Sequence, residues 1–395
     1  MRILLATESY YPNISGVSVA TFLLAKTLVQ QGHCVSILAP STDFTDREER
    51  SSDLDGLLVH RLRAIGNPFR PGFRVSFLRR KKAAQYVRRI EPDIVHLHDP
   101  AGISAGALAG ARALGIPVVI THHFTLDYVV AYMGFLGPAK NVARRMLVRY
   151  LTGFYNQADA VIAPSETVAK MLVGWGVKTN VSAISNGVPI ERFYSYSPPS
   201  AILRRYHLPT QVPLVLYVGR IDRDKSIEVL IEAVPRVLAR TRAHFVLVGG
   251  GESRAKCVKR AEQLGVAEAV TLVGEVPHES DDLPQLYQVA TVFVIPSAVE
   301  SQSIVTLEAM AAGLPIVAAN AGALTELVIP GENGLLFAPG DSASLADCVA
   351  RLLADRELAA RFGRESLVRA GRHRIEMMHG HVLDVYETLR RQRRA

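Results

Sequence analysis

Short apolar runs alternate along the chain with longer stretches in which apolar residues recur at helical spacing. Seven runs in the first half are rich in β-branched residues and predict buried strands: Ile3–Ala6, Val35–Ala39, Leu57–His60, Ile94–Leu97, Val118–Thr121, Ala160–Ala163 and Val181–Ile184. Six more follow: Leu214–Val218, Phe245–Val248, Val270–Val273, Val292–Ile295, Ile316–Ala319 and Leu335–Phe337. Helices such as Ser226–Arg240 and Leu345–Ala354 separate or follow them. Because parallel strands need crossover helices, the pattern predicts two Rossmann-like α/β domains, each with a parallel sheet.

The domain boundary is expected where this alternation weakens. The chain has 395 residues, more than the roughly 100–200 residues usual for one domain. The segment Glu191–Pro213 contains several serines and prolines and has the composition of a linker. We therefore expect an N-terminal domain over residues 1–195, a C-terminal domain over residues 196–371, and a basic helix over residues 372–395 that returns to the first domain.

The excess of positive over negative charge is confined to the first half of the chain. The net charge is +8, and residues 1–200 carry 22 Lys+Arg against 14 Asp+Glu, which leaves 23 against 23 in the remainder. Arg70–Arg89 contains eight basic residues and no acid, interleaved with aromatic and apolar residues. Such a segment suits an anionic lipid surface, with Arg79, Arg80, Lys81 and Lys82 as candidate contacts. A solvated helix face accounts for it equally well, and no recognisable nucleic-acid-binding module accompanies it.

Cysteine usage and the N-terminus indicate a cytoplasmic location. Cys34, Cys257 and Cys348 are odd in number and lack the spacing of a disulfide framework or a zinc site. Glu8 follows the first apolar residues too soon for a signal-peptide core, and no run approaches the roughly 18 apolar residues of a spanning helix.

Candidate chemistry is sought where strands end, because a doubly wound sheet binds ligands beyond the carboxyl ends of its strands. After Leu214–Val218, the loop contains Gly219, Arg220 and Lys225 and leads into a helix. Two cations beside main-chain N–H groups suit a diphosphate. An ordinary solvated loop is the alternative for these two residues alone.

A second candidate loop follows Val292–Ile295 and contains Glu300 and Glu308. If a helix begins near Ser303, Glu300 lies in the loop and Glu308 on the second turn of the helix. The two carboxylates can then accept hydrogen bonds from sugar hydroxyls and from a ribose. The helix-terminal N–H groups between them can hold phosphate oxygens. The spacing alone is a weak signal.

Several motifs occur together and in order around these residues. In the second half they are Val218-Gly219-Arg220, Val248-Gly249-Gly250-Gly251, the two glutamates, Glu308-Ala309-Met310-Ala311-Ala312-Gly313 and Gly331-Glu332-Asn333-Gly334. In the first half they are Tyr11-Pro12-Asn13-Ile14-Ser15-Gly16-Val17, Asp93-Ile94-Val95-His96-Leu97-His98 and Thr121-His122-His123. With these motifs, nearly the full chain resembles the family 4 glycosyltransferases.

The resemblance implies a GT-B fold, in which two parallel sheets face an interdomain cleft and the second domain holds a nucleotide-sugar donor. It assigns Arg220 and Lys225 to the diphosphate, Glu308 to the ribose and Glu300 to the donor sugar. The main chain of Ser301, Gln302, Ser303 and Ile304 would contact the phosphate and sugar, and Val276 the base. In the first domain Gly16 would approach the donor and His123 would face the transferred sugar, whereas His98 and His122 are expected to be packed histidines.

Three serines depart from the family pattern. Ser15, Ser226 and Ser303 stand where the family commonly has glycine, and these positions bear on the fine geometry of donor binding. No metal or other cofactor is expected. Asp53-Leu54-Asp55 and Asp222-Arg223-Asp224 have the D-x-D form of some metal sites, but the form is short and common, so both are taken as surface carboxylates.

The resemblance also implies transfer with retention of anomeric configuration. No carboxylate nucleophile is evident, which favours attack on the face from which the diphosphate leaves. The segments Thr121-His122-His123-Phe124 and Phe154–Ser165 and the form Glu300-Ser301-Gln302 resemble the branch that glycosylates diacylglycerol, with UDP-glucose as the expected donor. That branch acts at membrane surfaces, so a peripheral location on the inner face of the membrane is expected. A soluble acceptor, or nucleotide-sugar binding without transfer, are the alternatives.

Overall fold

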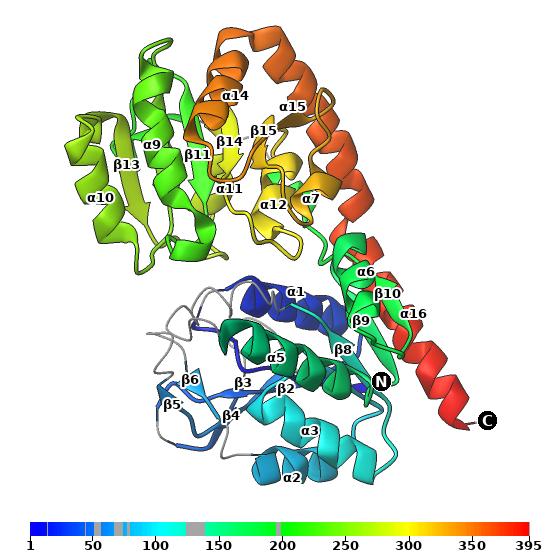
Figure 1. Cartoon of the computed structure of the whole chain (residues 1–395). Helices are drawn as coiled ribbons and strands as arrows, with labels where there is room; N and C mark the ends of the chain where they lie inside the picture. Colours follow the sequence, from blue (N-terminus) through cyan, green and yellow to red (C-terminus); the bar gives the residue numbers. More distant parts are fainter. Residues whose placement is uncertain are drawn as a thin grey trace. The chain divides into compact units, whose positions relative to one another are not determined.

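The computed structural model describes residues 1–13, 15–43, 45–50, 57–66, 74–76, 80–123, 139–194 and 199–394. The chain divides into two compact units (Figure 1). The first comprises Met1–Asn186 together with Met378–Ala395, and the second comprises Gly187–Met377.

The first unit is built on an eight-stranded sheet with the order β10-β9-β8-β7-β1-β2-β4-β3. Its strands are β1 (Arg2–Ala6), β2 (Cys34–Pro40), β3 (Arg47–Arg50), β4 (Leu58–Leu62), β7 (Ile94–Leu97), β8 (Val118–Thr121), β9 (Ala160–Ala163) and β10 (Val181–Ala183). The seven predicted strands are confirmed, and they pair in parallel. The edge strand β3 was not predicted: it pairs antiparallel with β4, and its sequence Arg-Glu-Glu-Arg carries no apolar signal.

Helices cover both faces of this sheet. They are α1 (Gly16–Gln30), α2 (Arg80–Ile90), α3 (Gly102–Ala113), α5 (Lys140–Tyr155), α6 (Glu166–Gly174) and α16 (Ile375–Arg394). Side chains alternate along β1, and Leu4 and Ala6 belong to one buried apolar cluster with residues of α2, α3, α5 and α6. On α16, Tyr386 is fully buried and its hydroxyl lies 2.5 Å from His96 Nδ1 on β7. A separate two-stranded sheet pairs β5 (Ile65–Gly66) antiparallel with β6 (Arg74–Val75).

The second unit contains a six-stranded parallel sheet with the order β13-β12-β11-β14-β15-β16. Its strands are β11 (Leu214–Val218), β12 (His244–Val248), β13 (Val270–Gly274), β14 (Val292–Ile295), β15 (Ile316–Ala319) and β16 (Gly334–Phe337). All six confirm the predicted runs. The main helices are α7 (Ile190–Tyr194), α8 (Pro199–Arg205), α9 (Ile227–Leu238), α10 (Arg254–Gln263), α11 (Asp282–Gln288), α12 (Ile304–Ala311), α13 (Leu324–Leu327), α14 (Ser342–Ala354) and α15 (Arg356–Ala370).

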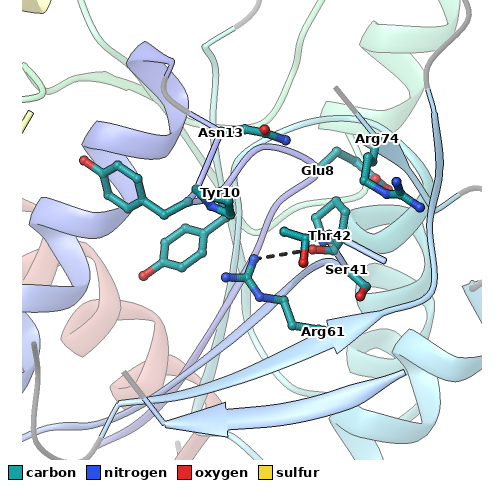
Figure 2. Close-up of a pocket in the computed structure, with 10 residues that line it drawn as sticks. Glu8, Tyr10, Asn13, Ser41, Thr42, Arg61 and Arg74 are labelled. Atoms are coloured by element: carbon teal, nitrogen blue, oxygen red, sulfur yellow. Dashed lines mark hydrogen bonds between the residues drawn. The ribbon is translucent and has the colours of Figure 1, made fainter. Parts of the chain in front are cut away.

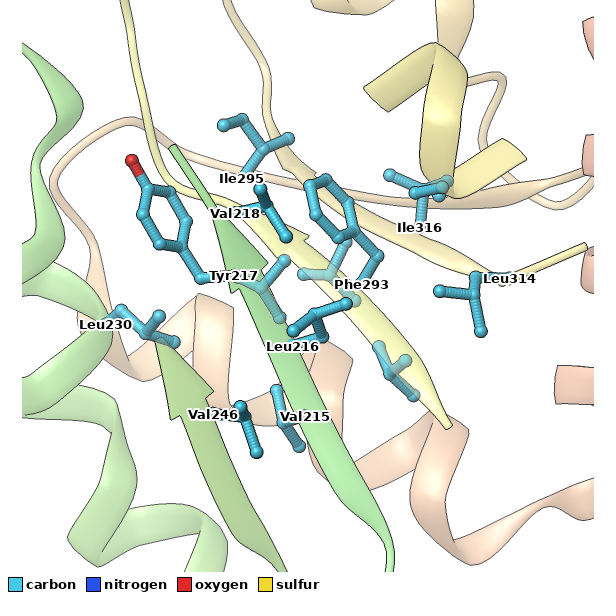
Figure 3. Packing of buried hydrophobic residues seen from close by; sticks show 14 of the residues in the cluster. Val215, Leu216, Tyr217, Val218, Leu230, Val246, Phe293, Ile295, Leu314 and Ile316 are labelled. Atoms are coloured by element: carbon cyan, nitrogen blue, oxygen red, sulfur yellow. The ribbon is translucent and has the colours of Figure 1, made fainter. Parts of the chain in front are cut away.

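The core of the second unit is centred on the middle strands (Figure 3). Leu216 on β11 lies opposite Phe293 on β14, and both are buried. Tyr217, the next residue on β11, is also fully buried and places its hydroxyl 2.7 Å from the Arg220 carbonyl oxygen. The apolar strand core therefore anchors the loop that carries the predicted cationic residues.

The prediction that Glu191–Pro213 forms a linker is wrong. Much of this segment belongs to α7 and α8, and Phe193, Ile202 and Leu208 are buried in the core of the second unit. The units divide at Asn186 and Gly187, before the predicted boundary, and again at Met377 and Met378. The serines and prolines suggested a spacer because the few buried apolar residues are too sparse to give a clear period.

Helices α2 and α3 pack with close backbone contact (Figure 1). A Cβ atom at Gly106 on α3 would lie 2.3 Å from the Arg80 carbonyl oxygen and 2.8 Å from the Ala83 Cβ. A glycine is needed there because no side chain fits between the two helices.

Among the described residues, no helix combines the length and apolarity needed to cross a bilayer.

Replacing Gly106 tests this contact. We expect Gly106→Ala to lower the free energy of unfolding of the first unit by about 1–3 kcal/mol, because α2 must move away from α3. The matched control is Gly153→Ala on α5, where a Cβ meets nothing within 4 Å. It should raise stability by up to about 1 kcal/mol through helix propensity. Urea unfolding followed by circular dichroism measures both, and equal effects of the two substitutions would contradict the packing argument.

Candidate functional site

Two glycine loops meet at the carboxyl edge of the second sheet. Gly219 follows β11 with φ 146°, and Gly249 follows β12 with φ 138°. A Cβ at Gly249 would lie 1.9 Å from the Gly219 carbonyl oxygen, so only glycine allows the two loops to touch. This backbone contact sets the course of the chain that continues through Arg220 to Lys225.

The predicted diphosphate residues lie in a compact cluster of opposite charges. Lys225 Nζ lies 2.7 Å from Glu300 Oε1 and 3.7 Å from Asp224 Oδ2. Arg220 pairs with Asp222 and, at 3.1 Å, with Asp224. The structure thus brings Arg220, Lys225 and Glu300 together, although Glu300 lies 75 positions after Lys225.

The carboxylates of the second D-x-D form, Asp222 and Asp224, take part in these ion pairs. Asp224 is only 4% exposed in its side chain, so its interpretation as a surface carboxylate is wrong: it is buried against the two cations. Asp53 and Asp55 lie outside the described residues. Within the described parts of the chain, no group of three or more His, Cys, Asp or Glu side chains is arranged to hold a metal ion.

The loop after β14 leads from Glu300 into helix α12. Ser297 donates a hydrogen bond to the Asp224 carbonyl oxygen at 3.2 Å and so joins this loop to the cationic loop. Ser301 is half-buried, Gln302 is buried, and Ser303 is the N-cap residue of α12, which begins at Ile304 as predicted. The first-turn N–H groups of the helix therefore lie only a few residues after Glu300 in the sequence.

Two of the serines that replace glycine occupy left-handed backbone positions. Ser226 has φ 54° and Ser303 has φ 78°. Such angles are costly for residues with a Cβ atom, which explains why glycine is common there. Ser303 is buried and its hydroxyl lies 2.7 Å from Thr306 Oγ1, a local contact that glycine cannot make.

Glu308 is buried in a hydrogen-bonded network on the second turn of α12. Its Oε1 lies 2.9 Å from His278 Nε2, and its Oε2 accepts a hydrogen bond from the Tyr287 hydroxyl at 2.7 Å. Burial opposes a charge on His278, but hydrogen bonds to Glu279 and Glu308 prevail and raise its pKa to about 9. No local sequence pattern indicates this partner, which fixes the position of the Glu308 side chain. Val276, the predicted base contact, lies after β13 and is half-buried against the core.

The carboxyl edge of the first sheet holds a group of histidines. His123 follows β8 and is half-buried, and its Nε2 lies 3.1 Å from His98 Nδ1, with the two rings stacked. Burial lowers the pKa of His123 to about 4 and that of His98 well below its usual value. His123 is therefore neutral at physiological pH, and His98 holds its ring in place.

The other predicted packed histidine, His122, is fully buried and lies 2.6 Å from the Tyr155 hydroxyl. It therefore belongs to the interior of the first unit. His98, in contrast, is buried but acts on the predicted site residue His123, a role that no sequence signal distinguishes from simple packing.

Sequence reasoning missed a pair of half-buried carboxyl groups at this same edge. Asp99 Oδ2 accepts a hydrogen bond from the Glu8 main-chain N–H at 2.5 Å. Glu8 in turn accepts from the Ile103 N–H at 2.6 Å and the Ser76 N–H at 3.0 Å. Burial raises the pKa of both carboxyl groups. In the sequence, only the position of Glu8 after β1 and of Asp99 after β7 marked these residues as candidates for the site.

Gly16 is the first residue of α1, and a Cβ there would meet nothing within 4 Å. The preceding Ser15 is the N-cap, with a reciprocal capping box to Ser18. The departure from glycine at Ser15 therefore has a structural reason: its hydroxyl satisfies the start of the helix.

The candidate membrane residues lie at the start of α2. Arg80 and Lys81 are exposed, and Lys82 Nζ lies over the Tyr86 ring at 5.7 Å. Arg79 lies outside the described residues. Tyr86 itself is buried, so the described part of this helix presents cations rather than aromatic rings to solvent.

Both halves of the chain match family models. The description "Glycosyltransferase Family 4" matches residues 14–192, and "Glycosyl transferases group 1" matches residues 200–368. The chain is 30% identical over 372 residues to a GDP-mannose-dependent alpha-mannosyltransferase of Mycobacterium tuberculosis, covering 93% of this chain and 92% of that protein.

Two further similarities agree with this match. The chain is 26% identical to an alpha-monoglucosyldiacylglycerol synthase of Streptococcus pneumoniae, covering 85% of this chain and 75% of the relative. The solved structure of sucrose-phosphate synthase from Thermosynechococcus elongatus superposes with a TM-score of 0.79 at 25% identity, over 98% of each chain. These matches and the two parallel-sheet units show that the chain belongs to glycosyltransferase family 4 and has the GT-B fold.

Proposed function

We propose that this glycosyltransferase moves a hexose from a nucleotide sugar, with UDP-glucose as the first choice, to a membrane lipid such as diacylglycerol. The proposal of a nucleotide-sugar donor rests on the cluster in which Lys225 Nζ lies 2.7 Å from Glu300 Oε1, beside Arg220. The relative named alpha-monoglucosyldiacylglycerol synthase supports the acceptor half.

The cluster can stabilise a leaving diphosphate without a metal. Cleavage of the bond between sugar and phosphate builds negative charge on the phosphate oxygens, and Arg220, Lys225 and the first turn of α12 supply fixed positive charge and N–H donors. The Glu300 carboxylate beside them would accept hydrogen bonds from sugar hydroxyls. Glu308, held by His278 and Tyr287, would bind the ribose through its remaining lone pairs.

His123 is the proposed contact of the transferred sugar from the first unit. Its depressed pKa keeps the ring neutral, so it would contact the sugar through a hydrogen bond rather than a charge. We propose retention of anomeric configuration, with the acceptor hydroxyl attacking on the face from which the diphosphate leaves.

Release of nucleoside diphosphate from a panel of UDP- and GDP-sugars, with and without diacylglycerol vesicles, tests the reaction. Lipid-dependent release with one donor is expected, and Glu300→Ala should lower its rate by about a hundredfold or more. The matched control is Glu357→Ala, an exposed glutamate on α15. EDTA should leave the rate unchanged, and the product should keep the anomeric configuration of the donor. Equal rates in Glu300→Ala and Glu357→Ala would contradict the assigned site.

Charge reversal tests the membrane contact. Changing Arg79, Arg80, Lys81 and Lys82 to Glu should abolish most binding to anionic vesicles, since each basic residue near such a surface contributes about 1 kcal/mol. The control changes the same number of charges in the second unit, at the exposed residues Arg351, Arg356, Arg361 and Arg364. Sedimentation with vesicles measures binding. Full retention after the first set of changes would exclude this segment, and activity insensitive to vesicles would favour a soluble acceptor.

The pair of His278 and Glu308 predicts a pH-dependent stability. The pKa of His278 is raised from 6.5 to about 9, so its stabilising contribution is complete below pH 6.5 and is lost as the pH rises through 9. The free energy of unfolding of the wild type should exceed that of His278→Gln by about 3 kcal/mol more at pH 6 than at pH 10. Denaturant titrations at several pH values measure the difference, and a pH-independent difference would show that the pair is not charged.

A further inference from the structure

Helix α5 of the first unit presents an apolar stripe to solvent (Figure 1). Val142, Met146 and Tyr150 follow one another at intervals of four residues, so their side chains lie on one face of the helix. Their exposed fractions are 49%, 68% and 45%. A single exposed apolar residue needs no explanation, but a contiguous group of them is typical of an interaction surface.

Basic residues accompany this stripe. The helix contains no acid and four basic residues: Lys140, Arg144, Arg145 and Arg149. Arg145 and Arg149 are exposed, and each lies three positions after a residue of the stripe and therefore beside it on the helix surface. Within the described part of the chain, none of the three arginines has a hydrogen bond or an ion pair. The face formed by the stripe and these arginines is thus both apolar and positively charged.

Other arginines of the first unit are engaged by the protein itself. Arg61, on the wall of the small pocket in Figure 2, lies 3.4 Å from the Pro40 carbonyl oxygen and over the Tyr10 ring. Arg89 on α2 pairs with Glu48. The arginines of α5 differ because their charge is not taken up by another described residue.

The exposed start of α5 lies at the carboxyl edge of the first sheet. The Tyr150 hydroxyl donates a hydrogen bond at 2.7 Å to the carbonyl oxygen of Pro100, which follows β7 at this edge. All fully buried residues of the helix come after this contact: Leu151, Phe154 and Tyr155. The turns before Tyr150 therefore lie at or beyond the sheet edge.

The same edge holds the predicted sugar contact and the start of α2. His123 lies there because it follows β8. Helices α2 and α5 contribute to one buried cluster, so they cover the same face of the sheet, and crossover helices begin at the carboxyl edge. The exposed cations Arg80 and Lys81 at the start of α2 therefore belong to this edge as well. One flat surface along the edge can contact both helices.

An apolar stripe beside unpaired arginines matches the surface of a membrane that contains anionic lipids. Guanidinium groups pair with lipid phosphates, and apolar side chains enter the boundary between head groups and acyl chains. Tyr150 suits this boundary because its ring is apolar and its hydroxyl is polar. A nucleic acid or an acidic protein would match the charge but not the stripe, and a second copy of this helix would be repelled by the first.

We propose that the face of α5 formed by Val142, Arg145, Met146, Arg149 and Tyr150 inserts into the surface of an anionic membrane. The inference rests on the proposed transfer to a lipid and names a surface that brings the enzyme to its acceptor. It adds an apolar contact to the cationic one proposed for α2, where Tyr86 is buried.

Sedimentation of the full chain with phosphatidylglycerol vesicles tests the apolar contact. Val142→Ser combined with Met146→Ser should weaken binding at least about tenfold, because two inserted side chains are lost. The matched control makes the same changes in the second unit, at the exposed residues Val368 and Met377, and should bind as the wild type does. Melting temperatures confirm folding, which is expected because all four side chains are exposed.

The cationic contact is tested on the same vesicles. Arg145→Gln combined with Arg149→Gln should weaken binding about tenfold or more, and Arg356→Gln combined with Arg364→Gln in the second unit is the control. Phosphatidylcholine vesicles should bind the wild type at least about tenfold more weakly than phosphatidylglycerol vesicles.

A tryptophan in the stripe reports insertion directly. Met146→Trp should add emission that shifts to the blue with phosphatidylglycerol vesicles and is quenched by brominated lipid, whereas Val368→Trp should show neither change. The wild type, whose single tryptophan is Trp175, supplies the background.

The inference is overturned if the wild type does not bind vesicles, or if the serine variants of α5 and of the second unit bind equally well. Unchanged Met146→Trp emission on bound vesicles would overturn it too, as would binding to polyglutamate or DNA without binding to vesicles. Insertion through α5 without any release of nucleoside diphosphate would contradict the proposed transfer and leave this inference standing. Transfer to diacylglycerol vesicles that is insensitive to the α5 changes would do the reverse.

Discussion

Parallel strands end at a common edge, and this constraint places nearly every candidate residue of the protein. In the second unit the cationic loop follows β11, Val276 follows β13 and Glu300 follows β14. In the first unit Glu8, His98 and His123 follow β1, β7 and β8. Residues far apart in sequence are thus gathered because each crossover helix returns the chain to the opposite edge, so that the loops after the strands converge.

The second unit pairs the cations of its candidate site with acidic side chains. Arg220 and Lys225 pair with Asp222, Asp224 and Glu300, and three of these five side chains are less than 15% exposed. Leaving a buried charge unpaired is costly, so these cations and acids stabilise one another. The proposed diphosphate would replace part of this pairing. Its affinity would depend on the difference between the ion pairs that are lost and those that are gained, rather than on the cations alone.

The first unit follows a different principle, in which burial shifts the pKa values of several titratable groups toward their uncharged forms. His96, His98 and His123 all have lowered pKa values, while Glu8 and Asp99 have raised ones. The C-terminal helix completes this interior, because Tyr386 contacts His96 and His379 contacts Thr27 at 2.7 Å. Neutral, hydrogen-bonded histidines at this edge can orient hydroxyl groups without adding a charge.

The sequence by itself determined the two-domain α/β architecture and thirteen of the strands, since buried parallel strands are continuous apolar runs. It also located Arg220, Lys225, Glu300 and the start of α12, because strand ends and helix caps have local signals. Only the tertiary structure decided which side chains touch: the pairing of Lys225 with Glu300, the contact of His278 with Glu308, and the burial of α7 and α8 in the second core. These depend on residues tens of positions apart, and no local pattern of apolar and polar residues records a long-range partner.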